Sequence, residues 1–159
     1  MDNVMTRASF LNTLRSARSE WDDMLAEVPR ELLEEPGVEG DWSIKDIMAH
    51  VAWHEREMVE VLRAREVAGS HLWELPTNER NRAIYEENKH RTLDDVLSDS
   101  GRVFRQLLRE VEALSDDDLN DPSRFKEMPT DWLPWKLIAE NSYEHYPGHA
   151  ASIRNWLES

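Results

Sequence analysis

The chain has 159 residues, enough for a hydrophobic core, and we expect a single domain over residues 1–159. It contains no cysteine, which excludes disulfides and metal sites built from thiolates. Acidic residues outnumber basic residues by 33 to 19, and the net charge of −14 argues against nucleic acid and anionic membranes as partners. No apolar run reaches the roughly 18 residues of a membrane span, and the N-terminus lacks a signal-peptide pattern. A cytoplasmic protein is expected.

Apolar residues recur at helical spacing in four long segments. The first is expected to form a helix from Thr6, as its N-cap, to Val28. The second begins after Ser43, which pairs with Asp46 as a capping box, and continues to about residue 67. On a helical wheel, the buried face of this second helix consists of Ile47, Val51, Met58, Val61 and Leu62.

The remaining elements complete a helical pattern. A loop is expected over residues 68–78 and a short helical stretch over 78–89, followed by a third long helix over 92–114. An irregular loop then leads to a fourth helix, which begins at Pro134, a favoured first-turn residue, and continues to residue 157. These elements predict an all-α four-helix bundle with one longer crossover and a short extra helix between helices 2 and 3.

Four of the six histidines form two pairs with i,i+4 spacing, which places both imidazoles of a pair on one helix face. One pair is His50 with His54 in the second helix, and the other is His145 with His149 in the fourth. Neutral imidazoles are common ligands of Zn²⁺, Ni²⁺ and Fe²⁺. Three imidazoles from two facing helices would leave open metal positions for water or substrate, as a catalytic site requires.

The histidine pairs also allow a second interpretation. A histidine on an apolar face is usually a hydrogen-bonded core residue, and for His145 and His149 both interpretations stay open. Pro147 lies between them, and because it lacks an N–H and its ring clashes with the preceding turn, the fourth helix is expected to kink or bulge there. Such irregularities gather at functional sites, although a kink can also simply follow the curvature of the bundle. His71 and His90 have polar neighbours and are expected to be exposed.

Two segments of the sequence resemble a known family. The segment GDWSIKDIMAHVAWHE resembles the second helix of the DinB/YfiT-like superfamily, and SYEHYPGHAASIRNWL resembles its last helix. The combination of WSIKDIMAH, the turn LSDDDL and the HYxxH-type ending is closest to the ClbS/DfsB-like branch. The order of the elements and the length also agree, so the resemblance covers essentially the whole chain. Pro147 and Gly148 depart from the family pattern, in which ordinary helix formers separate the two histidines.

The resemblance implies a divalent metal, zinc, nickel or iron, bound by three histidines. Carried over by position, these are His50 from the second helix and His145 and His149 from the fourth. The helical wheel alone does not choose between His50 and His54, whereas the resemblance does. His54 then becomes either a residue of the pocket or a fourth ligand. Activities within the family diverge, from thiol-dependent transferases and isomerases to hydrolytic protection against a reactive electrophile, so the fold does not determine the reaction.

We therefore expect a metal-dependent enzyme, a hydrolase or a thiol S-transferase, that acts on a small electrophilic molecule. The candidate catalytic residues are Glu57, as general base or as the group that orients a ligand imidazole, and His54. The alternative is a metal-independent protein of ClbS-like type that binds a small molecule for self-protection. A third interpretation is a structural bundle whose buried histidines satisfy one another. A homodimer through outward apolar residues is compatible with all three.

Overall fold

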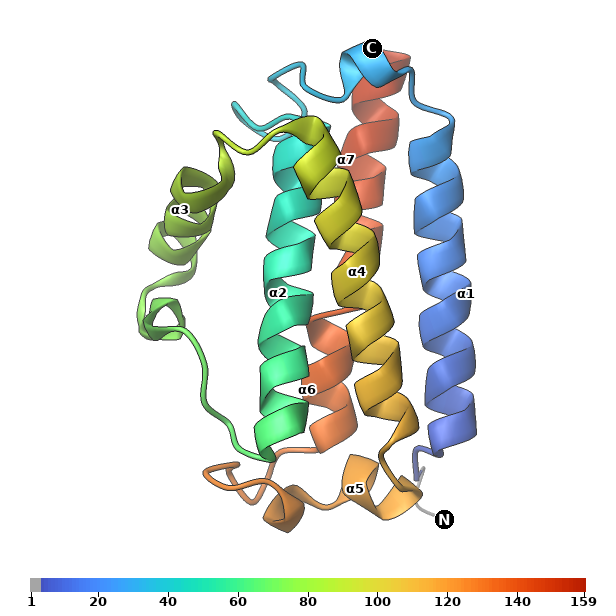
Figure 1. Ribbon diagram of the computed structural model, residues 1–159, viewed down its shortest axis with the longest axis vertical. Coiled ribbons are helices and arrows are strands. Elements are labelled where there is room, and N and C mark those ends of the chain that lie inside the picture. The colour runs from blue at the N-terminus through green and yellow to red at the C-terminus, as the bar shows by residue number, and fades with distance from the viewer. Residues whose placement is uncertain (1–3) are drawn as a thin grey trace.

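The computed structural model describes residues 4–159, so the first three residues of the predicted domain lie outside the described part. The fold is an all-α four-helix bundle, as predicted, and residues 4–159 contain no strand (Figure 1). Helices α1, α2 and α4 are continuous, while the fourth member consists of α6 and α7. The bounds are Arg7–Ala26 for α1, Ile44–Ala64 for α2, Thr77–Asn88 for α3, Leu93–Glu112 for α4, Asp116–Asn120 for α5, Pro134–Glu140 for α6 and Tyr146–Glu158 for α7.

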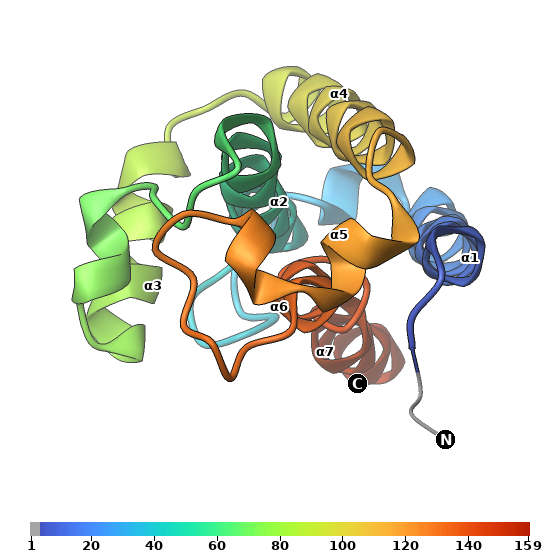
Figure 2. The same ribbon diagram turned by 90° about the horizontal axis from the view of Figure 1, so that it is seen from below.

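Helix α2 is the central helix of the fold. Seen from below, it lies between α3 on one side and α4, α6 and α7 on the other (Figure 2). The predicted capping box of Ser43 and Asp46 is present at its start, and each apolar residue predicted for its buried face is buried. Burial extends beyond that face to polar residues, including His50, His54 and Glu55. Because α3 covers a further side of α2, this helix has little exposed surface except near its C-terminal end.

The first three long helices end two or three residues earlier than predicted, at Ala26, Ala64 and Glu112. Val28 and Leu114 were assigned to helices because they are apolar at helical spacing, and both are indeed buried. They pack into the core from the turns that follow the helices, since burial does not require helical backbone. Among residues 4–159, no helix combines the length and apolar character that a membrane crossing needs.

The fourth helix differs from the prediction of one continuous, kinked helix. Residues 141–145 form turns that separate α6 from α7. Asn141 and Ser142 donate side-chain hydrogen bonds to the carbonyls of Leu137 and Ile138, a type of bond that competes with helix propagation. Pro147 lies in the first turn of α7, where its missing N–H has no intrahelical partner to lose. Pro147 therefore begins a helix instead of bending one.

Candidate metal centre

Three histidine side chains converge between α2 and the start of α7. The Nε2 atom of His145 lies 3.2 Å from Nε2 of His50 and 3.1 Å from Nε2 of His149. His50 comes from the second turn of α2, His145 is the residue before α7, and His149 lies in the first turn of α7. The helix break thus leaves His145 and His149 on one turn, with their imidazoles facing the same point. Gly148 between them is exposed, and a Cβ there would touch nothing within 4 Å.

The spacing of these nitrogens fits a metal ion. Metal–imidazole bonds are about 2.0–2.1 Å long, so two nitrogens at right-angled to tetrahedral positions are about 2.9–3.4 Å apart. One potential ligand atom from each of His50, His145 and His149 lies within 4.8 Å of the others. Three uncharged nitrogen ligands would leave one or more positions open, which is the arrangement of catalytic rather than structural sites.

Burial keeps the imidazoles of His50 and His145 in the form that binds metals. It lowers the pKa of His50 from 6.5 to about 2, with a further contribution from the neighbouring histidines. It lowers the pKa of His145 to about 3 in the same way, with contributions from His54 and His149. Both imidazoles are therefore neutral at physiological pH, and each has a lone pair available for a cation.

A carboxylate orients the third imidazole. Glu39 Oε2 lies 2.6 Å from Nδ1 of His149, so Nδ1–H donates to the carboxylate and Nε2 is left unprotonated, facing the other two histidines. Glu39 belongs to the loop before α2, which Gly37 and Gly40 turn with positive φ angles of 101° and 59°. Glu39 could not be identified from the sequence, because no periodic pattern or spacing connects this loop to the last helix.

His54 belongs to the same cluster of rings but not to the group of three. Its ring centroid lies 4.6 Å from that of His145, yet its Nδ1 pairs with Oδ1 of Asn141 at 2.9 Å. The amide nitrogen of Asn141 donates to the carbonyl of Leu137, which fixes Oδ1 as the acceptor. His54 therefore carries its proton on Nδ1 and an acceptor lone pair on Nε2. Burial lowers the pKa of His54 to about 4, against the opposing effect of Asn141.

Glu57 lies one turn beyond His54, and its carboxylate is engaged with the loop that follows α2. Oε1 of Glu57 accepts hydrogen bonds from the backbone N–H of Ser70, at 2.7 Å, and from the indole of Trp73, at 2.6 Å. Gly69 makes this approach feasible, because a Cβ at that position would lie 2.5 Å from the same oxygen. These contacts give Glu57 the role of holding Trp73 in place, and its role as a general base stays a prediction.

A cavity of about 800 Å³ adjoins the histidine cluster. Its wall includes His54 and Asn141 on the inner side, Trp73 and Arg80 on the side of α3, and Trp132 on the loop before α6. Its size falls in the range of small-molecule sites, about 300–1,000 Å³. His71 and His90 are both exposed, as predicted, and His71 also lines this cavity.

Buried polar atoms without partners concentrate around this centre. Within residues 4–159, five buried side-chain nitrogens lack a hydrogen-bond partner. Four of them surround the histidine cluster and the cavity: His50 Nδ1, His145 Nδ1, His54 Nε2 and Arg80 Nε. Since buried polar groups in proteins are almost always paired, such a concentration marks a place for a ligand or ordered water.

Several solved structures share this fold. The chain has a TM-score of 0.79 with each of DfsB, described as a sibling lethal factor precursor, and the colibactin self-resistance protein ClbS in complex with dsDNA. The sequence identities are 18% and 14%, and each comparison covers 97% of this chain and 96% of the other. A protein from Streptococcus pneumoniae has a TM-score of 0.79 at 15% identity, over 99% of this chain and 93% of that one. At these identities the comparison concerns the fold.

The sequence itself establishes the family. Comparison with curated proteins gives no match. A family model described as the DinB superfamily matches residues 13–151, which include all four clustered histidines, the whole of the first segment that carries the resemblance and residues 142–151 of the second. The predicted superfamily is thus confirmed, and the structures with the same fold include DfsB and ClbS, as the resemblance to the ClbS/DfsB-like branch predicted. The chain belongs to the DinB superfamily.

Proposed function

We propose that this protein is a metal-dependent enzyme of the DinB superfamily that acts on a small electrophilic molecule, by hydrolysis or by thiol transfer. His50, His145 and His149 would bind a divalent zinc, nickel or iron ion. The observation that carries the proposal is the convergence of their three Nε2 atoms, with distances of 3.2 and 3.1 Å between neighbours. Such an ion lowers the pKa of a bound water or thiol and so supplies a nucleophile near neutral pH.

The residues around the ion would perform the remaining tasks. Glu39 holds His149 with Nε2 toward the centre. His54 is the best-placed general base, because Asn141 fixes its tautomer and its Nε2 acceptor has no partner within residues 4–159. Glu57 would support the site indirectly, by orienting Trp73 in the wall of the cavity. The cavity of about 800 Å³ would hold the small molecule.

A metal-independent role is the second candidate. The observation that favours it is the similarity in fold to ClbS, which is described as a self-resistance protein. In this role the cavity would capture a reactive small molecule, and His54 with its free Nε2 would accept a hydrogen bond or a proton from it. The two candidates differ in their need for an ion.

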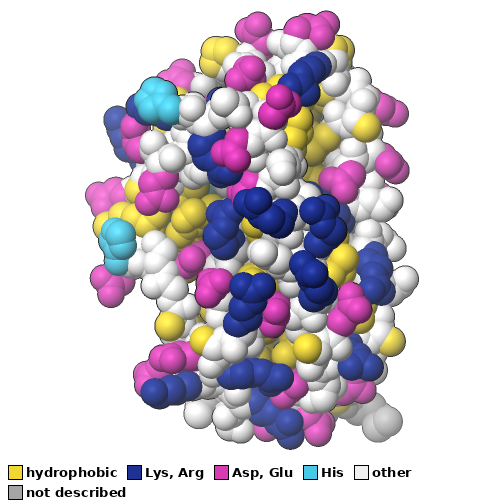
Figure 3. All heavy atoms as spheres, viewed as in Figure 1, with side chains coloured by type: hydrophobic (Ala, Val, Ile, Leu, Met, Phe, Trp, Pro, Cys, Tyr) yellow, Lys and Arg dark blue, Asp and Glu magenta, His cyan; other side chains and the backbone are white. Residues whose placement is uncertain are grey.

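The net charge of −14 does not exclude nucleic acid as a partner, because the ClbS structure with the same fold contains dsDNA. Basic side chains also gather on the face of the molecule formed by α2 and α4 (Figure 3). There the buried carboxylate of Asp99 forms ion pairs with three guanidinium groups, those of Arg56, Arg91 and Arg102. The net charge alone therefore does not decide whether nucleic acid is a partner of this protein.

Metal analysis of the purified protein tests the proposed function directly. We expect the protein, stripped with a chelator and then dialysed against Co²⁺, to bind about one equivalent and to show the visible absorption of Co²⁺ in a nitrogen-ligated site. The metal content is measured by mass spectrometry after gel filtration. A content well below one equivalent, in a protein that remains folded, would favour the metal-independent candidate.

The variant Glu39→Ala tests whether the carboxylate that orients His149 contributes to metal binding. Removal of a carboxylate that orients a ligand imidazole typically lowers metal affinity about 10–100-fold, and we expect a loss of Co²⁺ affinity in this range. The affinity is measured by competition with a chromophoric chelator. Glu35→Ala is the matched control, since Glu35 is an exposed carboxylate in the same loop. The Co²⁺ affinity of this variant should equal that of the wild type. Equal affinity of both variants would contradict the assignment of Glu39.

A further inference from the structure

Arg80 on α3 is a cation without a counter-ion among the described residues of a strongly acidic protein. It is half-buried, and it lines the cavity beside the histidine cluster. No ion pair formed within residues 4–159 includes Arg80. Its Nε is buried without a partner, and its hydrogen bond from Nη1 to the carbonyl of Leu75 is long, at 3.4 Å. Arginine donates five N–H groups, so most of the capacity of Arg80 is unused.

The guanidinium of Arg80 is held in a fixed orientation. Its central carbon lies 5.0 Å from the centroid of the Trp73 ring, a cation–π contact. Trp73 in turn donates its indole N–H to Glu57, which also holds the backbone of Ser70. The chain of contacts from α2 through Trp73 to Arg80 thus keeps a planar, charged fork at the wall of the cavity without neutralising it.

Arg80 lies close to the proposed metal centre. Its supporting ring, Trp73, packs against His54 with centroids 5.5 Å apart. A molecule bound to Arg80 would therefore have its other end near the histidine cluster.

The composition of the cavity wall selects the kind of anion. Among the residues that the structure describes, the wall contains no lysine and no arginine other than Arg80. Its two carboxylates, Glu74 and Glu140, are exposed to solvent, which screens their charge. A phosphate dianion usually requires several donors or cations, whereas one planar guanidinium matches one planar carboxylate through two parallel hydrogen bonds.

We infer that Arg80 binds the carboxylate of a small organic acid and thereby orients this acid toward the metal centre. The inference rests on the proposed function for the reaction at the centre, and it adds the chemical class of the substrate. The remaining wall, with Trp73, Trp132, Met58 and Val61, would contact the apolar part of the same molecule.

A pair of isosteric probes tests the anion site in metal-free protein. Benzoate and benzamide have nearly the same shape and differ in charge. We expect benzoate to bind at least about tenfold more tightly than benzamide, because charge-assisted hydrogen bonds to arginine are stronger than neutral ones. In isotope-labelled protein, the Nε–Hε NMR signal of Arg80, assigned from its loss in Arg80→Gln, should move on titration with benzoate and stay in place with benzamide.

Variants separate recognition from stability. Arg80→Gln should bind benzoate no better than benzamide, and Arg80→Lys, which keeps the charge but loses the planar fork, should retain only part of the preference. Arg82→Gln is the matched control, since Arg82 is exposed on the same helix and does not line the cavity, and it should behave as the wild type. A purely structural role for Arg80 would change the thermal midpoint but not the ratio of the two affinities.

The outcomes for the anion site and for the metal centre are distinguishable. Equal binding of benzoate and benzamide by the wild type, or an unchanged preference in Arg80→Gln, overturns the anion site. If Co²⁺ still binds in that case, the proposed metal centre stands alone. Conversely, a preference that depends on Arg80 in a protein that binds no Co²⁺ supports the anion site and overturns the metal-dependent function.

Discussion

The variant with both His145→Ala and His149→Ala should bind no Co²⁺ at a concentration that saturates the wild type. These two residues supply two of the three Nε2 atoms that converge at the centre. Their removal leaves the imidazole of His50 as the one remaining ligand of the three. One imidazole holds a divalent ion far more weakly than three, because each further ligand binds without the entropic cost of capturing a free ion. Equilibrium dialysis followed by mass spectrometry measures the loss, and circular dichroism verifies that the bundle remains folded.

The matched control for this variant removes the same number of imidazoles elsewhere. His71 and His90 are exposed, and neither belongs to the group of three. The double variant His71→Ala and His90→Ala should therefore bind Co²⁺ as the wild type does. If the two double variants lose equal amounts of metal, binding occurs at scattered surface sites and the proposed centre is wrong.

The fold and the cluster of histidines could be predicted because both depend on local periodicity. The spacing of apolar residues predicted the three continuous long helices and the position of the fourth member of the bundle, and the i,i+4 histidine pairs already indicated which imidazoles share a face. The wheel could not distinguish His50 from His54, which lie one turn apart on the same face. That choice depends on the level at which α7 begins beside α2, which is a property of the tertiary structure. In the structure, Asn141 engages His54, while His50 meets His145.

The parts that could not be predicted are contacts made by loops. Glu39 is one of 33 acidic residues, and it meets His149 only because a loop with two positive-φ glycines brings it to the first turn of α7. Glu57 was selected for its position on the helix face, but its partners Ser70 and Trp73 belong to a segment without periodic signal. Loop conformations depend on long-range packing, so a single sequence carries little information about them.

The break between α6 and α7 links these features. Pro147 was expected to disturb a continuous helix, and the structure places the interruption just before it, over residues 141–145. The end of α6 thereby presents Asn141 to His54, and the start of α7 presents His145 and His149 to His50. One local irregularity therefore positions three of the four histidines, which agrees with the tendency of helix interruptions to occur at functional sites.

A buried ion pair next to this break should contribute strongly to stability. Arg18 of α1 lies 3.3 Å from the fully buried carboxylate of Glu55 in α2, and it also donates to Ser100 of α4. The hydroxyl of Tyr146, the first residue of α7, donates to the same carboxylate. We expect Arg18→Ala to destabilise the protein by about 3–5 kcal/mol, because it leaves a buried carboxyl group without its cation. Urea denaturation measured by circular dichroism gives the free energy of unfolding.

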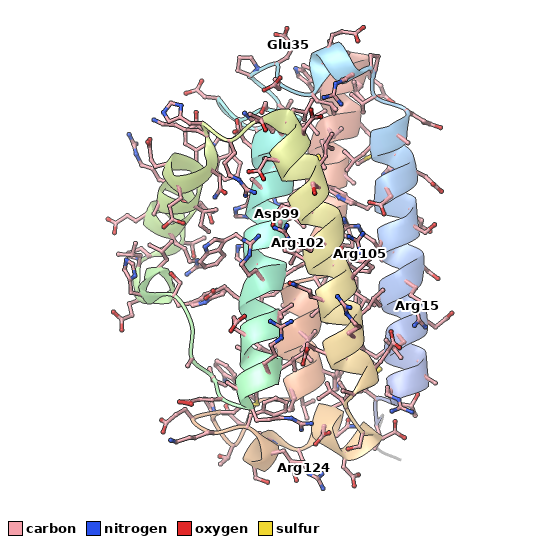
Figure 4. The ribbon with its side chains drawn as sticks, in the orientation of Figure 1. Arg15, Glu35, Asp99, Arg102, Arg105 and Arg124 are labelled. Carbon is pink, nitrogen blue, oxygen red and sulfur yellow. The ribbon has the colours of Figure 1, made fainter. Side chains whose placement is uncertain are left out.

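Two further variants separate the buried pair from a general effect of charge. Arg15 lies on the same helix, but its ion pair with Glu112 is about half exposed on both sides (Figure 4). Arg15→Ala should therefore cost at most about 1 kcal/mol. Replacement of both buried partners, Arg18→Met with Glu55→Met, should recover part of the stability that Arg18→Ala loses, since no buried charge is then left without a partner. If the double variant is as unstable as the sum of its single variants, the hydrogen bonds to Tyr146 and Ser100, and not the ion pair, hold the four helices together.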